Sequence, residues 1–182
     1  MGTIGKDFKY KIIKNFLSKD EIELLDLYCE ITFTTNLQNF DESAKTSNSD
    51  TYYYADRVME SLLLKKKQFM EKETNKKLLP TYSFWRMYTK YSDLQKHKDR
   101  EACEISVTVN IGSDGTSWPI FLDGTPIELN QGDAVIYLGR QLPHWREPFK
   151  GDWCAQCFLH YVDADGEFKE WEKDKRVYWG IT

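Results

Sequence analysis

Residues 104–111, with the sequence EISVTVNI, decide the fold class of this chain. Apolar and polar side chains alternate strictly along them, which is the pattern of a β-strand that packs one face on a core. The apolar positions are Ile105, Val107, Val109 and Ile111, and the polar positions are Glu104, Ser106, Thr108 and Asn110. Other short strands with Gly, Pro or Asp between them are predicted on both sides, including residues 81–91, 132–138 and 153–162. Many short antiparallel strands between residues 80 and 163 predict a sandwich, jelly roll or barrel.

The part of the chain before these strands is predicted to contain two helices. Ser18 and Glu21 form a capping box, so the first helix should begin at Ser18, after an extended segment. Residues 34–50 are polar and without periodicity, which predicts a long loop. An amphipathic helix is expected over residues 51–72, with Asp50 as its N-cap.

The composition suits one soluble domain. The 25 Lys and Arg residues against 29 Asp and Glu residues give a net charge of −4, and 41% of the residues are hydrophobic. No stretch approaches the roughly 20 apolar residues of a membrane span, and no signal peptide begins the chain, so we expect a cytoplasmic protein with no membrane partner. The absence of a basic block argues against a nucleic-acid partner. The expected division is an N-terminal strand with supporting helices (1–79), a β core (80–163) and a C-terminal tail (164–182) that packs back on the body.

The four cysteines are predicted to be free thiols. They are Cys29, Cys103, Cys154 and Cys157. Cys154 and Cys157 form a CxxC motif, but within a strand these two positions point to opposite faces. Zinc binding or redox chemistry at this motif is therefore not expected.

All three histidines, His97, His144 and His160, lie in the predicted β region. His97 and Asp99 are two residues apart, so in an extended chain their side chains point to the same side and can bind one ion. A third ligand, from His144 or His160, would complete the two-histidine, one-carboxylate set typical of non-haem Fe(II) oxygenases. His144 is the better candidate, because a short loop after the strand at residues 132–138 can return it to the barrel mouth.

The order of these motifs resembles the Fe(II)- and 2-oxoglutarate-dependent dioxygenases, and within them the prolyl-4-hydroxylase-like group. The similar features are HxD at residues 97–99, a strand about seven residues later, a G-D-A-x-x-Y strand, and a histidine 47 positions after the first. They cover residues 82–163. The resemblance implies a mainly β fold with supporting α: a double-stranded β-helix, or jelly roll, with the N-terminal helices packed on one side.

The resemblance also implies roles for individual residues. His97, Asp99 and His144 match the metal ligands of the family. Tyr88 matches a tyrosine that hydrogen-bonds 2-oxoglutarate, and Thr108 and Asn110 would line the same pocket.

The chain departs from the family at the residue that anchors the distal carboxylate of 2-oxoglutarate. The family usually has Arg or Lys nine to eleven residues after the distal histidine, where this chain has Trp153, Cys154 and Ala155. Arg146 is predicted as the replacement, because it lies two residues after His144 and a guanidinium can bind a carboxylate with two parallel bonds. Lys150 is a less favoured choice. His160, on the strand that normally carries the anchor, is predicted to line the pocket or to hydrogen-bond the cosubstrate.

The implied activity is hydroxylation of a peptidyl residue, such as proline, or of a small molecule. It would use Fe(II), O₂ and 2-oxoglutarate, which is decarboxylated to succinate. Two alternatives stay open: a cupin-like metal-binding barrel, and an inactive binding module of the same fold that does not use 2-oxoglutarate. Arg86 is interpreted as structural, and Arg100 as a partner of Asp99 or a substrate contact. Aromatic residues expected around the mouth are Tyr82, Trp85, Tyr91, Trp118 and Trp145.

Overall fold

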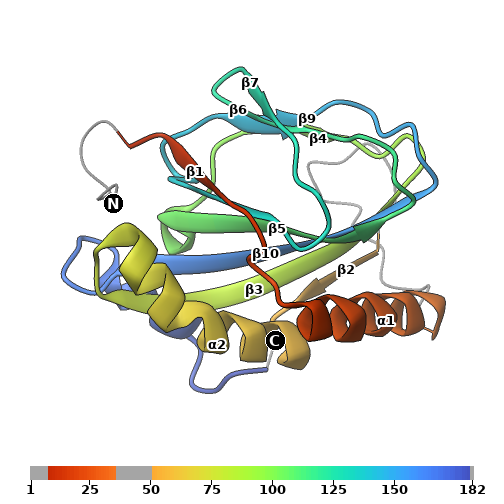
Figure 1. Cartoon of the computed structure of the whole chain (residues 1–182). Helices are drawn as coiled ribbons and strands as arrows, with labels where there is room; N and C mark the ends of the chain where they lie inside the picture. Colours follow the sequence, from red (N-terminus) through yellow and green to blue (C-terminus); the bar gives the residue numbers. More distant parts are fainter. Residues whose placement is uncertain (1–7, 36–50, 181–182) are drawn as a thin grey trace.

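The computed structural model describes residues 8–35 and 51–180 of the chain, and its described strands form two antiparallel sheets that face each other (Figure 1). The larger sheet has the strand order β1 (Tyr10–Ile13), β8 (Ala134–Tyr137), β5 (Ile105–Ser113), β10 (Trp153–Asp163), β3 (Leu78–Thr89) and β2 (Thr51–Tyr54). The smaller sheet has the order β4 (Leu94–His97), β9 (His144–Arg146), β6 (Ile120–Leu122) and β7 (Thr125–Ile127).

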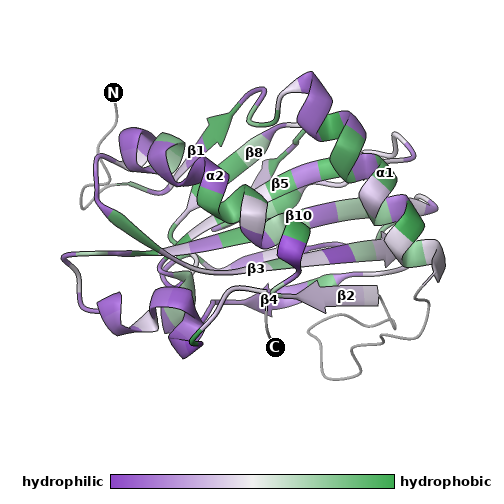
Figure 2. Ribbon diagram, turned by 90° about the horizontal axis from the view of Figure 1, so that it is seen from below, coloured by the Kyte–Doolittle hydropathy of each residue, from purple (hydrophilic) through white to green (hydrophobic). Residues whose placement is uncertain are grey.

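Helices α1 (Lys19–Thr35) and α2 (Arg57–Thr74) both cover the outer face of the larger sheet (Figures 1 and 2). The main apolar core lies between these helices and the sheet. The four apolar residues of β5 named above are all buried in this core, as their alternation predicts. The mainly β architecture with helices on one side is therefore confirmed.

The polar face of β5 is also buried, because the smaller sheet covers it. Ser106 and Thr108 are fully buried, and Asn110 is 8% exposed. Polar side chains in the interior of a β fold need hydrogen-bond partners, so a concentration of them is a place to look for a bound ligand as well as for structural hydrogen bonds. The space between the two sheets is therefore where a functional site is to be sought.

The first helix begins as predicted and the second does not. In the capping box, the amide of Ser18 donates to Glu21 Oε2 over 2.8 Å, and the amide of Glu21 donates to the hydroxyl of Ser18 over 3.2 Å. The prediction of a helix over residues 51–72 capped by Asp50 is wrong. Thr51–Tyr54 form the edge strand β2, paired with β3, and Asp56 caps α2 by accepting from two backbone amides. Three consecutive tyrosines favour a strand when a sheet edge is available to pair with them.

Of the predicted loop at residues 34–50, the first two residues belong to α1 and the rest lie outside the described residues. The four cysteines are free and buried, as predicted. Cys154 packs between the sheets and Cys157 packs in the helix-facing core, so the two thiols of the CxxC motif lie on opposite faces of β10. Within residues 8–35 and 51–180, no helix is long and apolar enough to span a membrane.

The C-terminal tail packs back on the body, as expected. It contains two short 3₁₀ turns within η2 (Lys169–Lys175), which lie against β3 and the short helix η1 (Glu101–Cys103).

Candidate metal and cofactor site

His97, Asp99 and His144 converge at one end of the smaller sheet. His97 ends β4 and His144 begins β9, and the two residues lie opposite each other in the antiparallel register. Asp99 Oδ1 is 3.4 Å from Nε2 of His97 and 3.5 Å from Nε2 of His144. One possible ligand atom of each residue lies within 4.8 Å of the others, so the three side chains could hold one metal ion.

Both imidazoles are oriented by backbone carbonyls. Nδ1 of His97 lies 2.8 Å from the carbonyl oxygen of Gln95, and Nδ1 of His144 lies 2.9 Å from that of Leu142. A carbonyl only accepts, so each Nδ1 donates its proton to that carbonyl and each Nε2 is turned toward Asp99. This is the arrangement of metal-binding histidines.

Asp99 is held in its charged form. Burial alone would raise its pKa, but hydrogen bonds with His144 and His97 hold the pKa of this carboxyl well below its usual range. Its backbone amide donates to the carbonyl of Gly139 over 3.0 Å, which attaches the HxD segment to the loop before β9.

The absence of a side chain at Gly139 makes room for the Asp99 carboxylate. A Cβ at this position would overlap Asp99 Oδ2 and would lie 2.5 Å from the hydroxyl of Ser106 and 3.0 Å from the carbonyl of Cys103. We therefore expect Gly139→Ala to displace Asp99 and to weaken Co(II) binding by about tenfold or more, the range seen when groups that support a ligand are lost. Isothermal titration of the purified variant measures this.

Gly124→Ala is the control for Gly139→Ala. Gly124 has a φ of +88°, and nothing lies within 4 Å of a Cβ added there. This variant should lose about 1 kcal/mol of stability from backbone strain and bind Co(II) like the wild type. Equal Co(II) affinity in both variants would refute the close packing of Asp99 on Gly139.

His160 reaches Asp99 through a serine. Its Nδ1 lies 3.0 Å from the hydroxyl of Ser106, and that hydroxyl lies 3.2 Å from Asp99 Oδ2. Burial lowers the pKa of His160 to about 4, so its imidazole is neutral at neutral pH. Asp99, Cys103 and His160 form a second cluster of possible ligand atoms, which shares its carboxylate with the first.

Arg146 is a buried cation without an acidic partner among the described residues. It points inward like His144, two residues before it, and is 4% exposed. Its Nη1 donates to the carbonyl of Trp118, its Nη2 donates to Gln156 Oε1 over 3.0 Å, and its Nε has no partner within the described part of the chain. Burial lowers the pKa of this guanidinium. A buried charge without a counter-ion is unfavourable, so this side chain suits an anionic ligand.

Arg146 lines a cavity of about 320 Å³ between the two sheets. Asn110, predicted from the sequence, is part of its wall: its amide nitrogen donates to the carbonyl of Leu129, and its oxygen accepts from Gln156. Thr108 is not among the lining residues; its hydroxyl lies 3.2 Å from that of Tyr137, whose ring packs edge-on against His144.

Tyr88 is buried beside this cavity. It lies opposite Cys154 in the register of β3 and β10, and its ring packs edge-on against Trp118 at 4.8 Å between centroids. Lys150, the less favoured anchor, is exposed. His160 does not line the cavity; it lies toward the metal ligands.

Two residues of the site were missed in the sequence. Gln156 lies on the same face of β10 as Cys154 and His160, and this period of two is the signal that could have identified it. Tyr137 is the tyrosine of the G-D-A-x-x-Y strand, so the motif contains it although no role was assigned to it.

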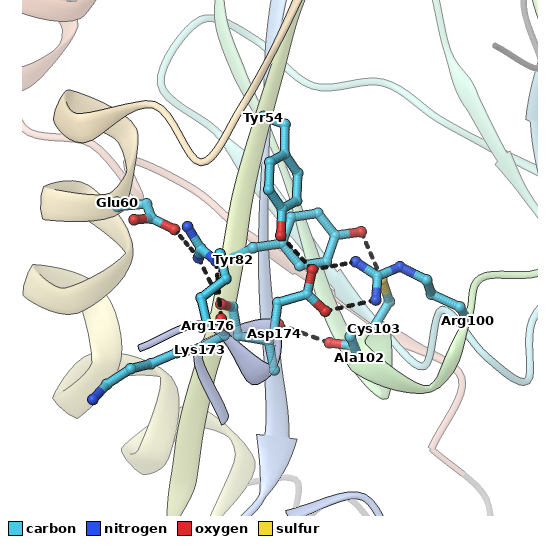
Figure 3. Close-up of polar contacts among 10 residues, drawn as sticks. Tyr54, Glu60, Tyr82, Arg100, Ala102, Cys103, Lys173, Asp174 and Arg176 are labelled. Atoms are coloured by element: carbon cyan, nitrogen blue, oxygen red, sulfur yellow. Dashed lines mark hydrogen bonds and ion pairs between the residues drawn. The ribbon is translucent and has the colours of Figure 1, made fainter. Parts of the chain in front are cut away.

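Arg100 does not bind Asp99. Both of its terminal nitrogens bond the carboxylate of Asp174, over 2.6 and 2.7 Å (Figure 3). Asp174 also accepts from Tyr54, and Arg176 bonds the buried Glu60 of α2 (Figure 3). We call residues 168–176 the C-terminal clasp, because they hold the segment after Asp99 from outside the barrel. Within the clasp, three consecutive residues, 173–175, have φ values between 53° and 61°, an unfavourable conformation for residues with side chains.

The prediction that Trp85 belongs to a ring of aromatic residues at the barrel mouth is wrong. This side chain is fully buried in the helix-facing core, where it stacks on Tyr53. Trp118 lies over the guanidinium of Arg146, and Tyr82 lies 4.5 Å from His160 between ring centroids. Arg86, interpreted as structural, lies on the inner face of β3, over the rings of Phe84 and Tyr88.

Comparison with solved structures identifies the fold. A Pseudomonas putida prolyl-4-hydroxylase superposes with a TM-score of 0.66 at 16% identity, over 86% of this chain and 94% of that chain. SnoK, a non-haem α-ketoglutarate-dependent carbocyclase from nogalamycin biosynthesis, gives 0.70 at 13% identity, over 86% and 80%. HygX from Streptomyces hygroscopicus, with nickel and 2-oxoglutarate bound, gives 0.65 at 12% identity, over 86% and 83%. No protein-family model and no curated protein matches the chain.

The chain thus has the double-stranded β-helix fold of the Fe(II)- and 2-oxoglutarate-dependent oxygenases, and the predicted resemblance is confirmed at the level of fold. A hydroxylase and a carbocyclase share this fold, so the fold alone does not choose the reaction.

Proposed function

We propose that this protein is an Fe(II)- and 2-oxoglutarate-dependent oxygenase. The observation that carries the proposal is the buried guanidinium of Arg146, which has no acidic partner among the described residues and lies in the same barrel as the triad His97, Asp99 and His144. A cation of this kind fits the distal carboxylate of a keto acid whose other end chelates the metal. The barrel of a protein that only bound a metal would not need it.

The triad and the residues that line the cavity would have separate roles. His97, Asp99 and His144 would hold the metal by three positions and leave the others for ligands. Arg146 would bind the distal carboxylate, with the amides of Asn110 and Gln156 beside it. Buried walls, including Tyr88 and Trp118, would exclude water from the reacting groups.

When bound, the iron supplies the oxidation of substrate by O₂, coupled to decarboxylation of 2-oxoglutarate to succinate. Two imidazoles and a carboxylate also suit Mn(II), Co(II) and Ni(II), and the HygX structure contains nickel. Iron is proposed because two histidines and one carboxylate are the ligand set of non-haem Fe(II) oxygenases, and a structural neighbour is named as a 2OG-Fe(II) oxygenase. The reaction we propose is hydroxylation of a peptidyl residue, such as proline, or of a small molecule. The prolyl-4-hydroxylase among the structural neighbours supports the first of these.

Anaerobic titration of the Fe(II)-loaded protein with 2-oxoglutarate tests the proposal. A chelated keto acid should give a weak visible charge-transfer band that saturates at one equivalent. Metal binding without such a band would reject the oxygenase and favour a cupin-like metal-binding barrel. Failure to bind metal would instead favour an inactive binding module of this fold.

A further inference from the structure

We propose that Ser106 and His160 are positioning residues that keep the Asp99 carboxylate monodentate, so that only Oδ1 can bind the metal. The inference rests on the proposed metal site and adds to it two residues that touch neither metal nor cosubstrate.

The two oxygens of Asp99 have different surroundings. Oδ1 is the oxygen within 3.4 and 3.5 Å of the two histidine Nε2 atoms. Oδ2 faces away from that pair and lies 3.2 Å from the hydroxyl of Ser106. The carboxylate is therefore already turned so that one oxygen serves the metal and the other serves the protein.

The direction of the hydrogen bonds follows from the proton count. The Ser106 hydroxyl has one proton, and its possible acceptors are the ionised Asp99 Oδ2, the carbonyl of Cys103 at 3.3 Å and Nδ1 of His160 at 3.0 Å. The carboxylate is the strongest acceptor of the three. Ser106 then donates to Asp99, and His160 must donate its Nδ1 proton to the oxygen of Ser106. The chain of donors runs from His160 through Ser106 to Asp99.

The surrounding packing leaves this arrangement little freedom. Ser106 is fully buried and His160 is 5% exposed. Gly139 lies against Oδ2, and the ring of Tyr82 contacts both His160 and the guanidinium of Arg100. The C-terminal clasp binds that guanidinium through Asp174. His160 is thus supported from outside the barrel as well as from within.

The consequence concerns the number of free metal positions. Two imidazoles and one carboxylate oxygen would take three metal positions and would leave the others for a chelating keto acid and O₂. A bidentate Asp99 would occupy a fourth and leave no separate place for O₂. Holding Oδ2 on Ser106 keeps that place open.

The test compares Co(II)-loaded Ser106→Ala and His160→Phe with the wild type, by visible absorption and by titration with 2-oxoglutarate. We expect both variants to change the Co(II) absorption band, which reports coordination, and to bind 2-oxoglutarate about tenfold more weakly. His160→Asn keeps a donor near the position of Nδ1 and should restore the wild-type band. Ser83→Ala is the matched control, because Ser83 is a buried serine whose hydroxyl has no partner among the described residues.

Wild-type spectra and wild-type 2-oxoglutarate affinity in Ser106→Ala would overturn the inference while leaving the proposed function intact. Ser106→Ala removes only the hydroxyl oxygen, so this variant should fold. It therefore tests the inference by itself even if His160→Phe does not fold. A wild-type protein that bound no Co(II) would overturn the proposed function, and this inference with it.

Discussion

Replacing His144 by alanine is expected to weaken metal binding by at least about 100-fold and to reduce 2-oxoglutarate turnover to background. The loss of groups that merely support a ligand costs roughly 10- to 100-fold in affinity, and His144 is proposed as a ligand itself. Its Nε2 is one of the two imidazole nitrogens that face Asp99 Oδ1, so only two ligands would remain. Isothermal titration with Co(II) and an assay of succinate formation measure the two effects.

Trp145→Phe is the control for the His144 variant. Trp145 is the next residue along β9, but its side chain lies on the other face of the strand, stacked on Phe121. This variant should bind metal like the wild type. If His144→Ala instead kept its affinity and His160→Ala lost it, His160 would be the third ligand, which is the alternative that the sequence leaves open.

Replacing Arg146 by leucine is expected to weaken 2-oxoglutarate binding by about 100-fold or more while leaving Co(II) affinity unchanged. Truncating one partner of a buried, hydrogen-bonded charge pair costs about 2–5 kcal/mol, which corresponds to that range. Arg146 is two residues from the metal ligand His144 but bonds Trp118 and Gln156, and neither belongs to the triad. The charge-transfer band described above, titrated with 2-oxoglutarate, reports the affinity.

Lys150→Ala controls for a general loss of positive charge near the site. Lys150 is exposed and should be replaceable without effect on 2-oxoglutarate binding. If Lys150→Ala bound 2-oxoglutarate more weakly and Arg146→Leu bound it like the wild type, the anchor would be Lys150, in the loop after β9, and not Arg146 in the barrel interior. Arg146→Lys keeps the charge but loses the planar fork, so an intermediate affinity is expected.

Local sequence patterns predicted the parts of the site that depend only on the alternation of side chains between the two faces of one strand. The alternation in residues 104–111 separated a helix-facing side from an inner polar side, and the spacing of His97 and Asp99 placed both on one side. The same alternation between faces predicted that Arg146 points inward with His144.

The alternation of side chains did not predict which face of a strand points inward where both faces carry the same kind of residue. Along β3, Tyr82 and Phe84 face the barrel interior while Trp85 faces the helices, and nothing local distinguishes the two sets of aromatic residues. The predicted N-cap of α2, Asp50, was wrong for a related reason. The strand Thr51–Tyr54 exists because β3 offers an edge to pair with, and that edge is distant in the sequence.

Contacts between remote segments could not be predicted at all. Arg100 and Asp174 are 74 residues apart, and no periodicity relates them. Gln156 meets Asn110 through the register of β10 against β5, and it meets Arg146 because β9 of the smaller sheet faces β10; a single sequence specifies neither.

The strand order of the larger sheet has a consequence for how the chain folds as it is synthesised. The last strand to be made, β10, lies in the middle of the sheet, between β5 and β3. These two strands precede it by about 40 residues or more and do not pair with each other. Such non-local pairing slows folding, since a long loop must close before its contacts form. The barrel that encloses the site therefore cannot close until residues 153–163 have left the ribosome, and until then β3 and β5 each have an open edge on which chaperones or other chains can pair.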